Sequence, residues 1–182
     1  SDVCSSDLAR TLVRAAEEKP KKNSERLREF SDAGLESMEL QLFSEEPIYA
    51  EYEIIKLADG LTFLSEILGY QHPIVKAALA GKSPQIRAAE LVLGTKVKDV
   101  QVRKTLYKDG QKAIEASKDP MIQLARAVDA ESRKVRKRME VEVEEPKRQA
   151  YAELAKVKFA LEGTSTYPDA TFTLRLAFGV VK

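Results

Sequence analysis

The feature that most constrains the fold is a row of small and apolar residues that recurs at alternating steps of three and four. Its members are Met121, Ala125, Val128, Ser132, Val135 and Met139, then Ala150, Leu154, Val157 and Leu161. This spacing is typical of a helix that packs along a second helix. Asp119-Pro120 marks its start, and Pro146 interrupts it because proline lacks an N–H and clashes with the preceding turn. The row therefore predicts two long helices in line, bent near Glu145, that pair with other helices.

Shorter helices are expected upstream. A capping residue precedes proline at His72-Pro73 and at Ser83-Pro84, and Asp99 begins another helix that Gly110 weakens midway. Helical propensity covers 9–19, and Ser24 is expected to cap a helix that runs to Leu42. Ser44-Glu-Glu-Pro47 predicts the start of a further helix that ends at Gly69. Its expected buried face consists of Ile48, Tyr52, Ile55, Ala58, Leu61, Leu64 and Leu68.

The pattern changes after Gly163. Residues 164–169 are turn material, and the residues that follow alternate between apolar and polar. The apolar members are Phe172, Leu174, Leu176, Phe178 and Val180. Alternation with a period of two predicts a β-strand, which needs partner strands. We therefore expect a mainly α fold, with a multi-helix domain over 9–163 and a turn and strand over 164–182 that join a sheet outside this sequence.

The first eight residues, Ser1-Asp-Val-Cys-Ser-Ser-Asp-Leu8, resemble the conceptual translation of a common sequencing-library adapter. We interpret residues 1–8 as a scar and leave them out of the expected fold. On this interpretation Cys4 is not native and the chain is an internal fragment of a longer protein. The alternative is a natural, disordered N-terminus.

Composition excludes several classes of function. The 182 residues contain one cysteine and one histidine, which rules out a disulfide framework and a His/Cys metal cluster. The 30 basic and 29 acidic residues balance, so we expect no nucleic-acid partner. No apolar run reaches the length of a membrane span, so we expect no membrane partner either. Glycines occur singly, without a phosphate loop, and no cofactor is expected.

Few residues are candidates for chemistry. His72 is interpreted as a helix cap rather than a catalytic base, and no nucleophile elbow accompanies it. The basic run 133–138 is followed directly by Glu140, Glu142, Glu144 and Glu145, which predicts an internally paired, solvated face rather than a phosphate or metal site. Tyr167, Asp169 and Arg175 could line a cleft, although a purely structural turn explains them as well.

The stretch Gly163-Thr-Ser-Thr-Tyr-Pro-Asp-Ala-Thr-Phe-Thr-Leu-Arg-Leu-Ala-Phe-Gly-Val-Val-Lys182 resembles the signature of the bacterial dipeptidyl-peptidase 7/11 family of serine exopeptidases. Ala116-Ser-Lys-Asp-Pro-Met-Ile-Gln-Leu-Ala-Arg-Ala-Val-Asp-Ala130 is similar to another segment of that family. The likeness is strong over 103–182 and looser over 9–102.

The resemblance implies a chymotrypsin-like double β-barrel peptidase with a large helical insertion. Such enzymes remove dipeptides from the free N-terminus of peptide substrates in the periplasm, use a Ser-His-Asp triad without metal or cofactor, and form homodimers. The triad motifs are absent from this sequence, and neither His72 nor Asn23 lies in a matching motif. The chain would then be the helical cap, inactive alone. The rival hypothesis is a non-catalytic, coiled-coil interaction module.

Overall fold

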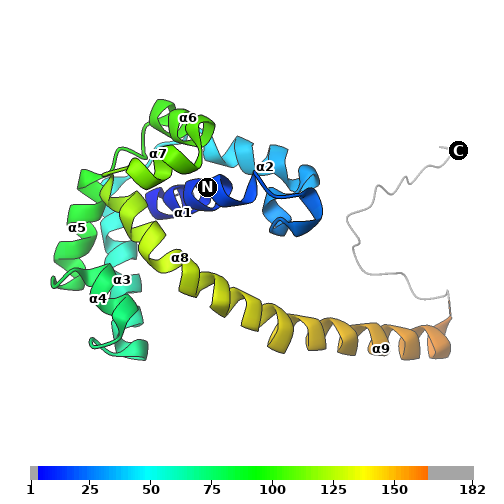
Figure 1. Cartoon of the computed structure of the whole chain (residues 1–182). Coiled ribbons are helices and arrows are strands. Elements are labelled where there is room, and N and C mark those ends of the chain that lie inside the picture. The colour runs from blue at the N-terminus through cyan, green and yellow to red at the C-terminus, as the bar shows by residue number, and fades with distance from the viewer. Residues whose placement is uncertain (1–3, 164–182) are drawn as a thin grey trace, which may run out of the picture. The chain divides into compact units, whose positions relative to one another are not determined.

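The computed structural model describes residues 4–163, and this part of the chain is mainly helical (Figure 1). It divides into two compact units, residues 1–133 and residues 134–182, each of which is described here by itself. The helical region expected as one domain over 9–163 thus divides after Arg133. The strand and turn predicted for 164–182 lie outside the described residues.

The first unit contains seven helices within its described residues and the first part of an eighth. They are α1 (Ser5–Glu18), α2 (Asp32–Leu42), α3 (Ala50–Leu68), α4 (Pro73–Leu79), α5 (Pro84–Gly94), α6 (Val100–Asp109), α7 (Gln111–Ala116) and α8 (Pro120–Met139). Two short 3-10 turns, Asn23–Glu25 and Arg28–Phe30, connect α1 to α2. In the second unit a π-helical turn, Glu140–Glu144, leads from α8 into α9 (Glu145–Glu162).

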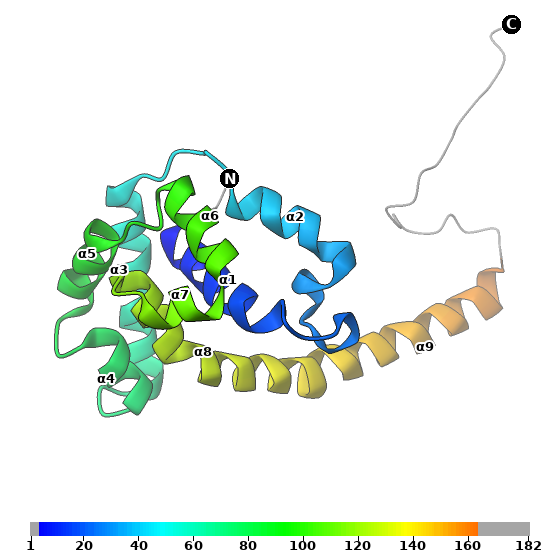
Figure 2. The same ribbon diagram turned by 45° about the horizontal axis from the view of Figure 1, so that its top comes forward.

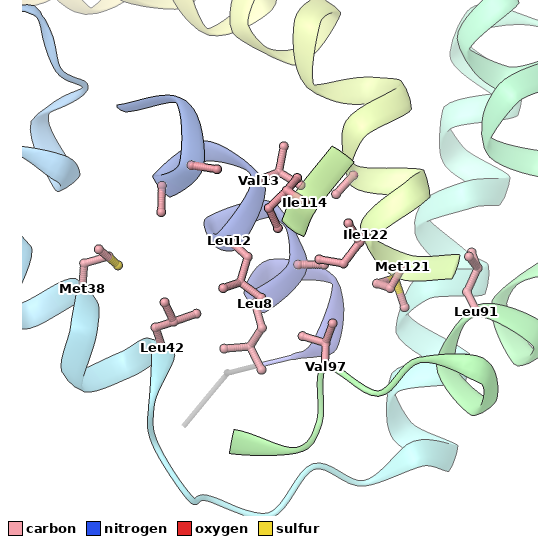
Figure 3. Packing of buried hydrophobic residues seen from close by; sticks show 14 of the residues in the cluster. Leu8, Leu12, Val13, Met38, Leu42, Leu91, Val97, Ile114, Met121 and Ile122 are labelled. Carbon is pink, nitrogen blue, oxygen red and sulfur yellow. The ribbon is translucent and has the colours of Figure 1, made fainter. Parts of the chain in front are cut away.

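Helix α1 is the centre of the main core. Its buried face is formed by Leu8, Leu12 and Val13, and it packs against α6, α7 and the start of α8 (Figures 2 and 3). The other side chains buried in this core include Phe30, Met38, Leu42, Leu91, Val92, Val97, Ile114, Met121 and Ile122. Burying a large aliphatic or aromatic side chain stabilises a fold by about 1.5–3 kcal/mol, so α1 contributes heavily to the unit.

A second, smaller core lies between α3, α4 and α5. Ala58 and Leu61 of α3 meet Val75, Ala78 and Leu79 of α4, and Ala88 of α5 completes the cluster. Helix α3 runs alongside α5 in both ribbon views (Figures 1 and 2). Short helices joined by tight turns explain why local sequence signals define α4 and α5 well.

The predicted helix starts with a cap and a proline are confirmed. His72 Nδ1 accepts a hydrogen bond from the Ile74 amide at 3.3 Å, and Ser83 Oγ accepts one from Ile86 at 3.4 Å. Asp119 does more than cap α8, because it also joins α8 to the loop after α5. Its carboxylate accepts bonds from the amides of Met121 (2.9 Å) and Lys96 (2.7 Å) and from the Thr95 hydroxyl (2.9 Å).

Other predicted boundaries are wrong. Ser24 does not begin a long helix, since the chain forms the two 3-10 turns first and α2 starts only at Asp32. The Asn23 side chain accepts a bond from the Asp32 amide at 2.8 Å and so helps to start α2. Helix α3 begins at Ala50 rather than after Ser44. Gly110 does not merely weaken one helix but separates α6 from α7 with a positive φ of 63°.

The expected buried face of α3 is also partly wrong. Ala58 and Leu61 are buried as expected, but Tyr52, Ile55 and Leu68 are exposed. The helix carries apolar residues on two opposite sides, and periodicity alone could not show which side faces the core.

Residues 5–8 belong to the folded unit, so leaving them out of the expected fold was wrong. Helix α1 begins at Ser5, and both Ser5 and Leu8 are buried. The Ser5 amide and hydroxyl donate hydrogen bonds of 2.5 Å to the two carboxylate oxygens of Glu53, which is itself buried. The origin of residues 1–8 remains a prediction.

In the second unit, the helix interruption predicted near Glu145 takes the form of the π-helical turn directly before it. A π-helical turn closes i→i+5 hydrogen bonds and is seen mostly as a short bulge inside an α-helix. Met139, Leu154 and Val157, which belong to the predicted packing row, are exposed here. Their expected helix partner is not among the described residues of this unit.

Candidate functional site

The residues proposed to line a cleft, Tyr167, Asp169 and Arg175, lie outside the part of the chain that the structure describes. His72 is described, and its imidazole caps α4, as expected. Its Nδ1 accepts the Ile74 amide bond, so the ring is held at the start of a seven-residue helix. His72 therefore has a structural role at the start of α4.

The most enclosed charged group is a network between α1 and α8. Arg14 Nε donates to Asp129 Oδ1 at 2.7 Å, and both side chains are less than 10% exposed. Arg133 Nε donates to the other oxygen of Asp129 at 2.5 Å, and its NH1 donates to Glu18 at 2.6 Å. The Arg14–Asp129 and Arg133–Glu18 contacts each join residues 115 positions apart in the sequence. The network therefore fixes α8 on α1.

Glu18 is the fully buried member of this network. It accepts bonds from Lys21 Nζ at 2.7 Å, from Arg133 and from the Leu27 amide at 2.9 Å. Burial raises the pKa of its carboxyl, but the bonds from Lys21, Arg133 and Leu27 outweigh burial and the net pKa lies below its ordinary value. Glu18 is thus a stable carboxylate that also ties the 3-10 turns to α1. Sequence spacing gave no signal for this group.

Two further polar groups lie between α6 and its neighbours, the buried Arg103 and the half-buried Tyr107. Arg103 is 1% exposed and donates through NH2 to the Ser44 carbonyl at 2.8 Å, and burial lowers its pKa. The Tyr107 hydroxyl donates to Glu39 at 2.6 Å, and burial followed by this bond raises the pKa of Tyr107 well above its ordinary value. Lys19 lies 3.7 Å from the centre of the Tyr107 ring. These contacts hold α6 against the loop before α3 and against α2.

A cleft of the first unit lies between α1 and α2. Its volume is about 590 Å3, and it is open to solvent. Polar walls come from Asp7, Arg10 and Glu46, while Met38 and Leu42 give apolar surface. Asp7 and Arg10 form an exposed ion pair at 2.8 Å. Thr11 and Ser44 place hydroxyl groups in the lining, but no histidine lies among the lining residues to act as their base, so the cleft can contact a ligand without showing a paired nucleophile and base.

The other surface feature is the outer face of α3, defined by Tyr52, Ile55, Phe63 and Ile67. These side chains are 59, 68, 64 and 66% exposed, and they lie on the side of the helix opposite Leu61. A helix that is apolar on both sides is usually covered on both sides. Clusters of large exposed apolar groups mark surfaces that contact another body. The outer face of α3 is therefore the best candidate for a contact surface in this unit.

The charged run in the second unit behaves as predicted. Arg136 pairs with Glu140 at 2.8 Å and Arg138 with Glu142 at 3.2 Å, both one helical turn along the chain. Within residues 4–163, no cluster of histidine, cysteine or carboxylate side chains has an arrangement that could hold a metal ion. No helix in the same range is both long enough and apolar enough to span a membrane.

Comparison with protein families identifies the chain. The model of the family described as Peptidase S46 matches residues 3–182. This is the family of dipeptidyl-peptidases 7 and 11, so the resemblance seen in the sequence is confirmed at the level of the family. A search of curated proteins found no match.

Proposed function

Because the chain belongs to the Peptidase S46 family, we propose that it is the helical cap of a serine-type dipeptidyl-peptidase of the periplasm. The parent enzyme would release dipeptides from the free N-terminus of peptides. The cap alone would be inactive, and a Ser-His-Asp triad in the rest of the enzyme would do the chemistry. The resemblance also supports a homodimeric parent enzyme.

The observation that carries the cap role is the position of the outer face of α3. Helix α3 is held from one side by α4 and α5, and it presents Tyr52, Phe63 and Ile67 on the other side. A cap needs both properties, a stiff support and an apolar surface that can pack on a second body. The buried network between α1 and α8 adds stiffness to the same unit.

The chemistry of peptide cleavage explains why the cap and the rest of the parent enzyme would have separate roles. Acyl transfer needs a nucleophile, a base and donors for the developing oxyanion. The only histidine of the chain already caps α4, so we expect the base to come from elsewhere in the parent enzyme. Cleavage after the second residue needs, in addition, a wall that prevents the bound peptide from extending further. A rigid helical layer over the cleft would supply this wall and exclude water.

The test measures where the parent enzyme cuts. Phe63→Asp combined with Ile67→Asp places two charges on the outer face of α3. Because both side chains are exposed, we expect the helical unit to stay folded by circular dichroism. If this face holds the cap against the rest of the parent enzyme, the variant should release fragments longer than dipeptides or cleave N-acetylated peptides.

Leu93→Asp is the matched control, because Leu93 is 67% exposed on α5 and lies outside the outer face of α3. It should keep the dipeptide register of the unchanged enzyme. Dipeptide release that is the same in all three proteins would overturn the cap role. Release of dipeptides from a longer peptide by the isolated chain would contradict its inactivity.

The second candidate, a helical interaction module, is favoured by the exposed apolar residues of α9, among them Leu154, Val157 and Leu161. Extending the reading frame separates the two functions. A downstream Gly-Asn-Ser-Gly segment and an upstream histidine in a Thr-Asn-His-His-like context support the peptidase, and their absence from the complete frame supports the module.

A further inference from the structure

The outer face of α3 carries negative charge as well as apolar side chains. Residues 44–71 contain six acidic residues and a single basic one, Lys56. At 3.6 residues per turn, Asp59 and Glu66 lie within about 40° of Tyr52 around the helix axis. These two carboxylates are therefore on the same side of α3 as the exposed apolar row.

Neither carboxylate is neutralised by a neighbour. Asp59 and Glu66 are exposed, and neither has an ion pair or a side-chain hydrogen bond among residues 4–163. Lys56 lies 5.3 Å from the centre of the Tyr52 ring, so it contacts an aromatic side chain rather than a carboxylate. The outer face of α3 thus offers two unpaired negative charges beside apolar side chains.

These features together fit a partner that is both cationic and apolar. The exposed ring of Phe63 gives apolar contact area, and its face attracts the cation of a lysine or arginine side chain. A carboxylate binds the same cations through charge-assisted hydrogen bonds. An acidic partner would instead bring like charges together, which costs free energy.

The spacing of the carboxylates indicates the shape of the partner. Asp59 and Glu66 are seven residues apart, which is close to two helical turns and about 10 Å along the axis. A second helix that lies along α3 repeats its own contact side at the same interval of seven residues. Basic residues seven apart on that helix can therefore reach both carboxylates at once.

We propose that the outer face of α3 binds a basic, amphipathic helix in the rest of the parent enzyme. Its apolar side chains pack on Phe63 and Ile67, while lysine or arginine residues seven apart pair with Asp59 and Glu66. This inference rests on the proposed function, because it names the partner on which the cap is held. The apolar contact supplies most of the affinity, and the charges select the partner and its register.

The test measures binding of a defined probe to the whole 182-residue chain. The probe is an N-acetylated, fluorescent peptide of leucine, alanine and lysine, about 16 residues long, with leucines on one helical side and lysines seven apart beside them. Two further peptides serve as comparisons, one with glutamate in place of lysine and one with the same composition in scrambled order. Fluorescence anisotropy should show binding of the basic peptide alone, and this binding should weaken as salt is raised.

Asp59→Asn with Glu66→Gln removes both charges and keeps the shapes of the side chains. The dissociation constant of the basic peptide should rise about tenfold at low salt, as expected for two exposed ion pairs, and much less at high salt. Glu36→Gln with Asp109→Asn is the matched control, because both residues are exposed and lie outside α3. It removes the same net charge and should bind like the unchanged chain. Circular dichroism verifies that each variant is folded.

Several outcomes would overturn the proposal. An absence of binding, or equal binding of the glutamate peptide, would exclude a basic partner. Equal binding of the scrambled peptide would show that the face attracts charge without recognising a helix, as expected for a surface that collects unfolded peptides. An unchanged dissociation constant in Asp59→Asn with Glu66→Gln would place the probe elsewhere, and self-association of the chain that this variant abolishes would assign the face to a second copy.

The failure of this inference can be distinguished from failure of the proposed function. Peptide binding by the chain tests the chemistry of the partner. The length of the fragments released by the parent enzyme tests the cap role. A chain that does not bind the basic peptide, in a parent enzyme whose Phe63→Asp and Ile67→Asp variant loses the dipeptide register, would leave the cap role supported and this partner excluded.

Discussion

Arg14 of α1 and Asp129 of α8 form a buried ion pair, with Nε 2.7 Å from Oδ1, although 114 residues separate them along the chain. Arg133 shares the same carboxylate. A buried pair of this kind is weak evidence for net stability, but removing one partner leaves an uncompensated buried charge. The pair therefore gives a sharp test of how α8 is attached to α1.

Arg14→Met should lower the free energy of unfolding by about 3 kcal/mol. The reason is that Asp129 loses one of its two cationic partners in a buried position. Urea denaturation followed by circular dichroism gives the measurement. Arg10→Met on the same helix is the control, because the Arg10–Asp7 pair is about half exposed and its loss should change stability by less than about 1 kcal/mol. Equal effects of the two substitutions would contradict the network.

The buried carboxylate of Glu18 should make the stability of the fold depend on pH. Burial raises the pKa of Glu18, but the hydrogen bonds from Lys21, Arg133 and Leu27 lower it by a larger amount. The pKa in the folded state therefore lies below the unfolded value. Such a carboxylate stabilises the fold above its unfolded pKa, and this contribution is lost as the pH falls through the folded pKa. The free energy of unfolding should therefore decline below about pH 5.

Glu18→Gln should make that decline shallower, as measured by urea denaturation at a series of pH values. Glu17→Gln is the matched control, since Glu17 also pairs with Arg133 but is 44% exposed in its side chain. A decline that is as steep in Glu18→Gln as in the unchanged chain would show that other carboxylates are responsible.

The two aspartate caps, Asp119 at α8 and Asp99 at α6, should contribute unequally to stability. Asp119→Ala removes the cap of α8 and also the acceptor for Thr95 and the Lys96 amide, so we expect a loss of about 2–3 kcal/mol. Asp99→Ala removes an exposed cap that accepts a bond from the Gln101 amide and should cost about 1 kcal/mol. Thermal unfolding of both variants gives the comparison, and equal shifts would mean that the link to the 95–96 loop is unimportant.

Replacing either of two helical glycines with alanine should change stability, in opposite directions for the two positions. A Cβ at Gly34 would lie 2.9 Å from the Arg28 carbonyl oxygen and 3.0 Å from that of Glu29, so Gly34→Ala must move α2 off the 3-10 turn and destabilise the unit. Gly60, inside α3, has no heavy atom within 4 Å of the added Cβ. Gly60→Ala should therefore stabilise by about 0.5–1 kcal/mol through helix propensity. Chemical denaturation distinguishes the two, and a stabilising Gly34→Ala would be a clear contradiction.

The sequence predicted helices best where the signal was local. His72, Ser83, Asp99 and Asp119 all cap helices as expected, because a capping side chain and the amides it satisfies lie within three residues. Ser44 failed because α3 starts only at Ala50, and the Ser44 carbonyl instead accepts the bond from Arg103, 59 residues away. Such distant contacts leave no local pattern.

The candidate surfaces were harder to predict. Tyr52 and Ile55 share a period with Ala58 and Leu61, so the spacing gave no means of separating the outer face of α3 from its core face. The Glu18 network joins α1 to α8 and to the 3-10 turns, and none of its residues forms a motif. Tyr167, Asp169 and Arg175 lie outside the described residues, so their role as cleft-lining residues stays a prediction.

Helix α1 packs against α7 and the start of α8, which are the last parts of the first unit to be synthesised. This order has a consequence for folding on the ribosome. Leu8 and Leu12 find their partners Ile114, Met121 and Ile122 only after more than a hundred further residues have been made. At about 5–20 residues per second, this delay is on the order of ten seconds. Until then α1 can pack only against the earlier members of this core, such as Phe30, Met38 and Leu42, so part of its apolar side stays exposed on the nascent chain. The α3–α5 region can close earlier, because its partners are near one another in the chain.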